Sequence, residues 1–266
     1  MKISIIGGGN MGEAILVAVL KQGLSTPQEI VVSDISKARR DYLKKKYGVA
    51  VTLDNLAAVA GAEIVILAIK PQILFDVLTE LHNEVKPEQL VLSIIAGARL
   101  NTIVNGLNHN KVVRSMPNTP AQIGEGMTVW TATPEVTLKQ KKQAKAILGV
   151  MGEEIYTAEE KFLDMATAVS GSGPAYVFYF VESLIEAALH LGFTPDVAEK
   201  LVRQTFLGAT HLLQKSAKPP AELRRNVTSP GGTTAAAIEQ LEKGGLNKLV
   251  ALAVAAAFKR AKELGK

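Results

Sequence analysis

Few folds accommodate the amino-terminal end of this chain, where a short β-branched run passes straight into a glycine-rich turn and then an apolar helix. Residues 2–6 read KISII, the turn GGGNMG places glycines at 7, 9 and 12, and a helix is expected from Ala14 to Leu20. In such a unit the first glycine permits a tight turn, the second lets backbone approach a pyrophosphate, and the third lets the helix pack on the strand. The sequence therefore predicts a dinucleotide-binding turn at Gly7–Gly12.

Strand-like and helix-like runs alternate through the first 157 residues. Strands are expected at residues 29–33, 49–52, 62–69, 90–95, 111–116, 126–132 and 154–156, and helices at 39–47, 72–81 and 136–150. Such alternation is typical of a parallel, doubly wound α/β sheet. Residues 1–157 are therefore predicted to form a Rossmann-type domain.

After Tyr156 only helical runs follow, so residues 158–266 are predicted to form an all-helical second domain. The expected helices are 158–169, 175–191, 195–215, 221–226, 234–243 and 246–264. The run 175–191 is apolar around much of its circumference, which is typical of a helix buried in a bundle or a subunit interface. Alanines at 251, 253 and 255–257 favour close helix–helix contact. We expect this domain to dimerise.

The end of the second strand carries conflicting signals about the cofactor. Asp34 stands where an acidic side chain would accept hydrogen bonds from an adenine-ribose diol, which favours NAD. Several neighbours could instead contact the 2′-phosphate of NADP: Ser33, Ser36, Lys37, Arg39 and Arg40. Both NAD and NADP therefore stay open.

Other strand ends add candidates for the same crevice. Lys70, followed by Pro71, ends a buried run, and Ala96 and Gly97 end the next one, so all three residues are expected on the ligand side of the sheet. A solvated Lys70 is the alternative. Asn118 lies between two prolines in a rigid turn, where it either sits near the nicotinamide or only reverses the chain.

A second glycine turn, residues 226–234, precedes a predicted helix near the other end of the chain. Pro230, Gly231 and Gly232 are incompatible with a regular helix, so the next helix begins just after them. Its first-turn N–H groups lack intrahelical partners and lie at the positive end of the helix dipole, which suits a carboxylate. The alternative is an ordinary turn with a threonine N-cap.

Composition excludes several classes of function. The chain has no cysteine, and its four histidines lack metal-ligand spacing, so no structural metal is expected. Its formal charge is +5, but the basic residues are dispersed and aromatics make up only 5%, so nucleic acid is not an expected partner. No signal sequence or membrane span is recognised, and we expect a cytoplasmic protein.

The 226–234 turn contains neither histidine nor lysine to act as a general acid. Reduction of a carbonyl requires a proton for the nascent alkoxide. A protonated imine does not, because its reduction yields a neutral amine. The missing acid therefore weakly favours C=N over C=O as the reacting bond.

The chain resembles the pyrroline-5-carboxylate reductases over essentially its whole length. The residues that carry the resemblance are GGGNMG, Ala68–Pro71, Ile95–Gly97, Gly171–Tyr176, Pro220, Leu223, Val227–Ser229, Gly232, Thr234, Ala237, Ile238, Leu241 and Glu242. The resemblance implies NAD(P)H-dependent reduction of (S)-1-pyrroline-5-carboxylate to L-proline, the last step of proline biosynthesis. It also implies paired subunits with interlocked helical domains, which in some members build rings of dimers.

The resemblance also implies site residues. The cofactor would contact Gly7, Gly8, Gly9, Asn10, Met11, Gly12, Ser33, Asn55, Ile69, Lys70, Ala96 and Asn226, to which strand-end position adds Asp34, Pro71 and Asn118. The substrate would lie on Glu160, Ser229, Gly231, Gly232, Thr233 and Thr234.

We hypothesise that backbone N–H groups of Gly232–Thr234 bind the substrate carboxylate. The Thr234 hydroxyl would then hydrogen-bond the ring nitrogen while hydride passes from nicotinamide C4 to the imine carbon. Two alternatives stay open: a reductase for hydroxyacids or another cyclic imine, and a dinucleotide-sensing protein without turnover. The hydroxyacid alternative is disfavoured because residues 175–189 carry no lysine.

Overall fold

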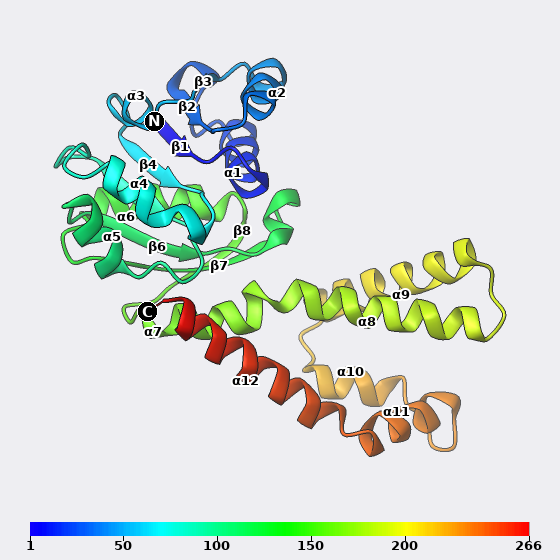
Figure 1. Cartoon of the computed structure of the whole chain (residues 1–266). Helices are drawn as coiled ribbons and strands as arrows, with labels where there is room; N and C mark the ends of the chain where they lie inside the picture. The colour runs from blue at the N-terminus through cyan, green and yellow to red at the C-terminus, as the bar shows by residue number, and fades with distance from the viewer. Residues whose placement is uncertain (266) are drawn as a thin grey trace. The chain divides into compact units, whose positions relative to one another are not determined.

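The computed structural model describes residues 1–265, which form two compact units (Figure 1). One unit contains Met1–Ser172 together with residues 256–265, and the other contains Gly173–Ala255. Helix α7 (Lys161–Ala166) therefore belongs with the sheet. The domain boundary between residues 157 and 158 stays a prediction.

The first unit is built on one eight-stranded sheet within the described residues, in the order β3-β2-β1-β4-β5-β6-β7-β8. The strands are β1 (Ile3–Ile6), β2 (Ile30–Ser33), β3 (Ala50–Thr52), β4 (Ile64–Leu67), β5 (Leu90–Ser93), β6 (Val112–Met116), β7 (Gly126–Ala132) and β8 (Gly152–Tyr156). The pairs from β3 to β6 are all parallel, which gives the 3-2-1-4-5-6 order of a dinucleotide-binding sheet. The predicted doubly wound Rossmann-type fold is confirmed.

The expectation of a parallel sheet is wrong for the last two strands. β7 runs antiparallel to β6, with Met116 opposite Val129, and β8 pairs parallel with β7, so β7 and β8 both run opposite to the other strands. Only residues 117–125 connect β6 to β7, including the 3₁₀ turn Thr119–Ile123. A parallel crossover needs a dozen or more residues, whereas an antiparallel return can be shorter.

Apolar side chains cover both faces of this sheet. Neighbouring residues alternate between the faces, so that Ile5 belongs to one core cluster and Ile6 to the other. Helices α1 (Asn10–Lys21), α2 (Lys37–Tyr47) and α6 (Leu138–Gly149) cover the first face. Helices α3 (Asn55–Val59), α4 (Leu74–Glu80) and α5 (Leu100–Leu107) cover the second.

Two of these helices were not foreseen. α3 has only five residues, and α5 contains Gly106, which lowers helix propensity. Burial stabilises both, because Val59 and Ile103 lie in the second core cluster. In addition, the helix expected over 158–169 is divided into α7 and a π-helical turn, Thr167–Gly171.

The second unit consists of helices. These are α8 (Gly173–His190), α9 (Pro195–Lys215), α10 (Pro220–Asn226), α11 (Thr233–Lys243) and α12 (Leu246–Leu264), whose last residues belong to the sheet unit. α8 and α9 lie side by side (Figure 1). The ring centroids of Phe180 on α8 and Phe206 on α9 are 5.8 Å apart. No helix within residues 1–265 has the length and apolar character needed to cross a membrane.

This helical unit leaves its apolar residues largely uncovered. Between Gly173 and Ala255 only Ala198 and Val202 are buried. Large side chains on α8 are instead exposed, including Phe178 at 60% and Tyr179 at 72%. Large apolar side chains exposed in such number on one unit indicate an interaction surface.

Gly12→Ala should strongly destabilise the sheet unit. A Cβ built on Gly12 would lie 2.0 Å from the carbonyl oxygen of Gly7, and that atom belongs to backbone. We expect a loss of at least about 2 kcal/mol in the free energy of unfolding, as for severe overpacking. Urea denaturation would measure it.

Gly9→Ala is the matched control, since a Cβ there meets nothing within 4 Å and Gly9 has an ordinary φ of −67°. Its unfolding should stay close to wild type. Equal stability of the two variants would contradict the packing role assigned to Gly12.

Candidate functional site

The carboxyl ends of β1, β2 and β4 meet at one edge of the sheet, beside the Gly7–Gly12 turn. Gly7 has φ +102°, and a Cβ there would lie 2.6 Å from Ala68 O, so only glycine fits. Gly9 is the N-cap of α1 and provides no side-chain cap for its first turn. The uncapped N–H groups and the open space around Gly9 fit the pyrophosphate of a dinucleotide.

Asp34 is tied to this turn by its side chain. Its Oδ2 accepts the N–H of Gly8 at 2.8 Å, and its Oδ1 accepts the N–H of Ser36 at 2.8 Å. Residues 26 positions apart in sequence are thereby joined at the ends of β1 and β2. Each carboxylate oxygen keeps a further lone pair for a ligand.

The two arginines of this region are engaged in different ways. Arg39 donates to the Gly8 and Gly9 carbonyls and forms an ion pair with Glu13. Arg40 donates to the Asp34 carbonyl at 2.6 Å. Burial raises the pKa of the Glu13 carboxyl, but hydrogen bonds from Tyr47, Arg39 and Tyr42 outweigh burial and lower that pKa to about 2. Glu13 is thus ionised at neutral pH and compensates Arg39.

The fold places Ser33 beside Asn55, and it adds Glu80, a residue that the sequence did not indicate. The Ser33 hydroxyl donates to Asn55 Oδ1 at 2.6 Å, and Asn55 Nδ2 donates to Glu80 at 2.7 Å. Glu80 ends α4 and orients the Asn55 amide. A helix-end glutamate has no local sequence pattern that would reveal this role.

Four further predicted cofactor residues follow β4 and β5. Lys70 is exposed and precedes the 3₁₀ turn that begins at Pro71, and Ile69 and Ala96 are half-buried. Next to Ala96, Gly97 is covered by the end of α12, because a Cβ on Gly97 would lie 2.9 Å from Leu264 O. Gly97 therefore does not line an open crevice, contrary to expectation.

The Asn118 side chain is occupied by backbone partners. Its Oδ1 accepts the N–H of Met127 at 2.9 Å, and its Nδ2 donates to Ser170 O at 3.1 Å. These bonds fix the turn between β6 and β7 against the π-helical turn. A contact with the cofactor stays a prediction for this residue.

Glu160 forms an ion pair with the buried Arg114, a residue that the sequence did not indicate. Arg114 on β6 is 3% exposed and donates to Glu160 at 2.8 Å and to Asp164 at 2.9 Å. Glu160 also accepts the N–H of Leu100 at 2.7 Å. Nothing in the local sequence KVVRSM distinguishes Arg114 from a solvated strand arginine.

The remaining predicted substrate residues form the turn before α11 in the helical unit. Gly232, not a threonine, is the N-cap of α11, and no side chain caps that helix, so the threonine N-cap alternative is wrong. Gly232 N–H donates to Ser229 O at 3.0 Å and is not free for a ligand. A Cβ on Gly232 would lie 2.5 Å from the Ser229 hydroxyl, a side-chain group that can rotate, and 3.2 Å from the Ser229 carbonyl oxygen.

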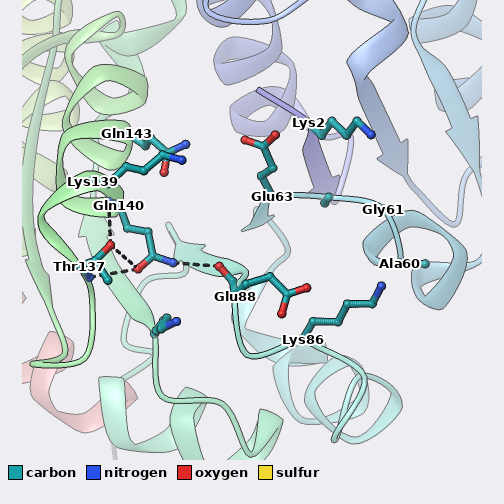
Figure 2. Close-up of a pocket in the computed structure, with 12 residues that line it drawn as sticks. Lys2, Ala60, Gly61, Glu63, Lys86, Glu88, Thr137, Lys139, Gln140 and Gln143 are labelled. Atoms are coloured by element: carbon teal, nitrogen blue, oxygen red, sulfur yellow. Dashed lines mark hydrogen bonds between the residues drawn. The ribbon is translucent and has the colours of Figure 1, made fainter.

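A surface cavity of about 520 Å³ lies elsewhere on the sheet unit (Figure 2). Lys2, Glu63 and Lys111, which precede β1, β4 and β6, line it, so it opens at the amino ends of the strands. Figure 2 shows Gln140 on α6 reaching the Glu88 carbonyl across its floor, at 3.1 Å. It contains none of the predicted site residues.

Comparison with known proteins matches both parts of the chain. Residues 160–264 match the family model described as pyrroline-5-carboxylate reductase dimerisation. Residues 2–97 match the model described as NADP oxidoreductase, coenzyme F420-dependent.

Full-length relatives point the same way. A pyrroline-5-carboxylate reductase from Synechocystis is 42% identical over 100% of this chain and 99% of that protein. The structure of such a reductase from Coxiella burnetii superposes with a TM-score of 0.91 at 40% identity, covering 100% of this chain and 98% of that one. That of Plasmodium falciparum, solved with NADP bound, has a TM-score of 0.90 at 31% identity over 100% and 98% of the two chains.

Asp164→Ala should destabilise the protein because it leaves the buried Arg114 guanidinium with one carboxylate instead of two. Removing one partner of a buried ion pair typically costs about 3–5 kcal/mol, and we expect about 3 because Glu160 remains. Urea denaturation at neutral pH measures the loss. Asp76→Ala, which removes an exposed carboxylate from α4, should change the free energy of unfolding by less than about 1 kcal/mol. Similar effects of the two substitutions would contradict this role of Asp164.

Proposed function

The chain belongs to the pyrroline-5-carboxylate reductase family, and we propose that it reduces the C=N bond of (S)-1-pyrroline-5-carboxylate to give L-proline. The full-length identity of 42% to a named member carries this proposal. A nicotinamide dinucleotide is the proposed cofactor, and NADP is supported by the family model and by the Plasmodium falciparum structure. When bound in reduced form, it supplies the hydride.

The starts of α1 and α11 support a division of labour between the units. Both helices begin at an extended glycine N-cap, Gly9 (ψ −168°) and Gly232 (ψ 170°), and neither start has a side-chain cap. By contrast, the side chains of Ser36, Asp54 and Thr137 cap the helices that follow them. We assign the α1 start to the dinucleotide pyrophosphate and the α11 start to the substrate carboxylate.

The proposed substrate contacts follow from the hydrogen bonds at α11. Gly232 N–H is already paired with Ser229 O, so the backbone donors left for a carboxylate are those of Thr233 and Thr234. The Thr234 hydroxyl makes no cap and is the group proposed to hydrogen-bond the ring nitrogen. Because the imine is already protonated, these residues need only bind and orient it. Glu160, Ser229 and Gly231 complete the proposed substrate set.

The helical unit carries the dimerisation domain of the family, and the chain forms a homodimer. The exposed apolar surface of α8 and α9 is the proposed interface, since the unit buries few side chains by itself. Further assembly of dimers into a ring, and a cytoplasmic location, are part of this proposal.

The decisive assay is loss of the reduced nicotinamide absorbance when purified protein meets pyrroline-5-carboxylate. Turnover with this imine and none with hydroxyacids is expected. Turnover with hydroxyacids alone would favour the hydroxyacid alternative, and binding of dinucleotide without any turnover would favour a sensor.

Thr234→Ala should lower kcat/KM by about 10- to 100-fold, because it removes one hydrogen bond to the reacting imine. Stability should stay unchanged, since this hydroxyl caps no helix. Steady-state kinetics and urea denaturation measure the two effects. Thr234→Ser keeps the hydroxyl and should restore most of the rate; wild-type kinetics in Thr234→Ala would remove Thr234 from the mechanism.

Phe178→Glu should dissociate the homodimer, because it places a charge in an apolar surface that is 60% exposed in the single chain. Light scattering after size exclusion should give at least twice the 28.3 kDa chain mass for the wild type and a lower mass for the variant. Phe75→Glu changes a phenylalanine that is 70% exposed on α4 of the sheet unit, and this variant should keep the dimer. Dissociation by Phe75→Glu alone would locate the interface elsewhere.

A further inference from the structure

We propose that Asp34 makes this enzyme select NADH over NADPH, accepting hydrogen bonds from the adenosine ribose hydroxyls and repelling a 2′-phosphate. The inference rests on the proposed function and deepens it by naming the preferred cofactor. It starts from position: Asp34 directly follows β2, at the carboxyl edge beside the Gly7–Gly12 turn. In a dinucleotide-binding sheet the ribose lies at this strand end.

The carboxylate cannot turn away from that position. Gly8 N–H holds Oδ2 and Ser36 N–H holds Oδ1, each at 2.8 Å. Both donors are backbone groups of turns that are themselves fixed, because Gly8 is held by Arg39 and Ser36 caps α2. A side chain fixed in this way presents its remaining lone pairs to a diol, which donates two hydrogen bonds. It presents the same negative charge to a phosphate.

The basic residues nearby do not offset this charge. Arg39 is bound to the Glu13 carboxylate and to the Gly8 and Gly9 carbonyls, so its positive charge is compensated. Lys37 pairs with Asp41 at 2.6 Å. Arg40 is the cation of this helix start that has no carboxylate partner within residues 1–265, and its guanidinium is held by the Asp34 carbonyl.

The neighbouring side chains add little for a phosphate. Ile35 is 82% exposed and offers no donor. The Ser36 hydroxyl accepts the N–H of Arg39 as the cap of α2 and keeps a single O–H to donate. A 2′-phosphate would thus meet one carboxylate, one hydroxyl and one partly engaged arginine, where phosphate sites normally offer several charged donors. This balance decides between the two cofactors that the sequence left open.

The test is direct binding, followed by nicotinamide fluorescence of NADH and NADPH titrated with the full-length protein. We expect the wild type to bind NADH at least about tenfold more tightly than NADPH at low salt, with the ratio falling as salt screens the carboxylate. Asp34→Ser should reduce the ratio of the NADPH dissociation constant to the NADH dissociation constant by at least about tenfold, mainly by strengthening NADPH binding.

Asp76→Asn is the matched control, since it removes an exposed carboxylate from α4 and leaves Gly8 and the cations of α2 untouched. In this control the ratio of the NADPH to the NADH dissociation constant should stay within about twofold of wild type, as for a screened surface charge. Asp34→Asn, which keeps the side-chain shape, replaces Asp34→Ser if that variant does not fold. Equal or tighter NADPH binding by the wild type, or an unchanged ratio in the folded Asp34 variant, would overturn the proposal.

The same experiment keeps the two proposals apart. Selective NADH binding without reduction of pyrroline-5-carboxylate would leave Asp34 as the selectivity residue and refute the proposed function. Reduction that runs equally well with NADPH would refute the role of Asp34 and leave the proposed function standing.

Discussion

An α-helix cannot satisfy the N–H groups of its own first turn, and α1 and α11 leave those groups uncapped behind an extended glycine. At α1 the glycine turn also lies against β1 and β4 so closely that Gly7 and Gly12 tolerate no side chain. At α11 the turn is closed by Gly232 N–H on Ser229 O, which leaves the next two N–H groups for a ligand. Both helix starts therefore suit anions, and the chemistry that we propose needs two: a pyrophosphate and a carboxylate.

The side chains around the sheet edge are positioned by hydrogen bonds over long sequence distances. Asp34 is held by Gly8, Asn55 by Ser33 and Glu80, and Glu160 by Arg114. Each bond fixes a side chain that would otherwise sample several rotamers. Because folding already orders these side chains, a ligand that binds there loses less conformational entropy. Arg114 is the extreme case, since a guanidinium 3% exposed is tolerated only because two carboxylates compensate it.

The helical unit follows a different constraint. Its helices are long and apolar, yet a layer of helices with so few buried side chains cannot be stabilised by its own core. Exposed Phe178 and Tyr179 require a partner surface, and a second copy of the chain is the partner that the family's dimerisation domain provides. The stability of this unit therefore depends on dimer formation, so its folding is coupled to assembly of the enzyme.

By itself the sequence determined the features that depend on neighbouring residues. Periodicity and glycine or proline signals act locally, and they predicted the strand–glycine turn–helix unit at Gly7–Gly12. They also predicted the alternation of strands and helices along the sheet unit, and the exact bounds of α9 and α12. The tertiary structure decided the direction of β7, the burial of Gly97 beneath Leu264, the engagement of Asn118 by Met127 and Ser170, and the pairing of Arg114 with Asp164. These features join residues far apart in the chain, and no local pattern encodes a partner that only folding brings within hydrogen-bonding distance.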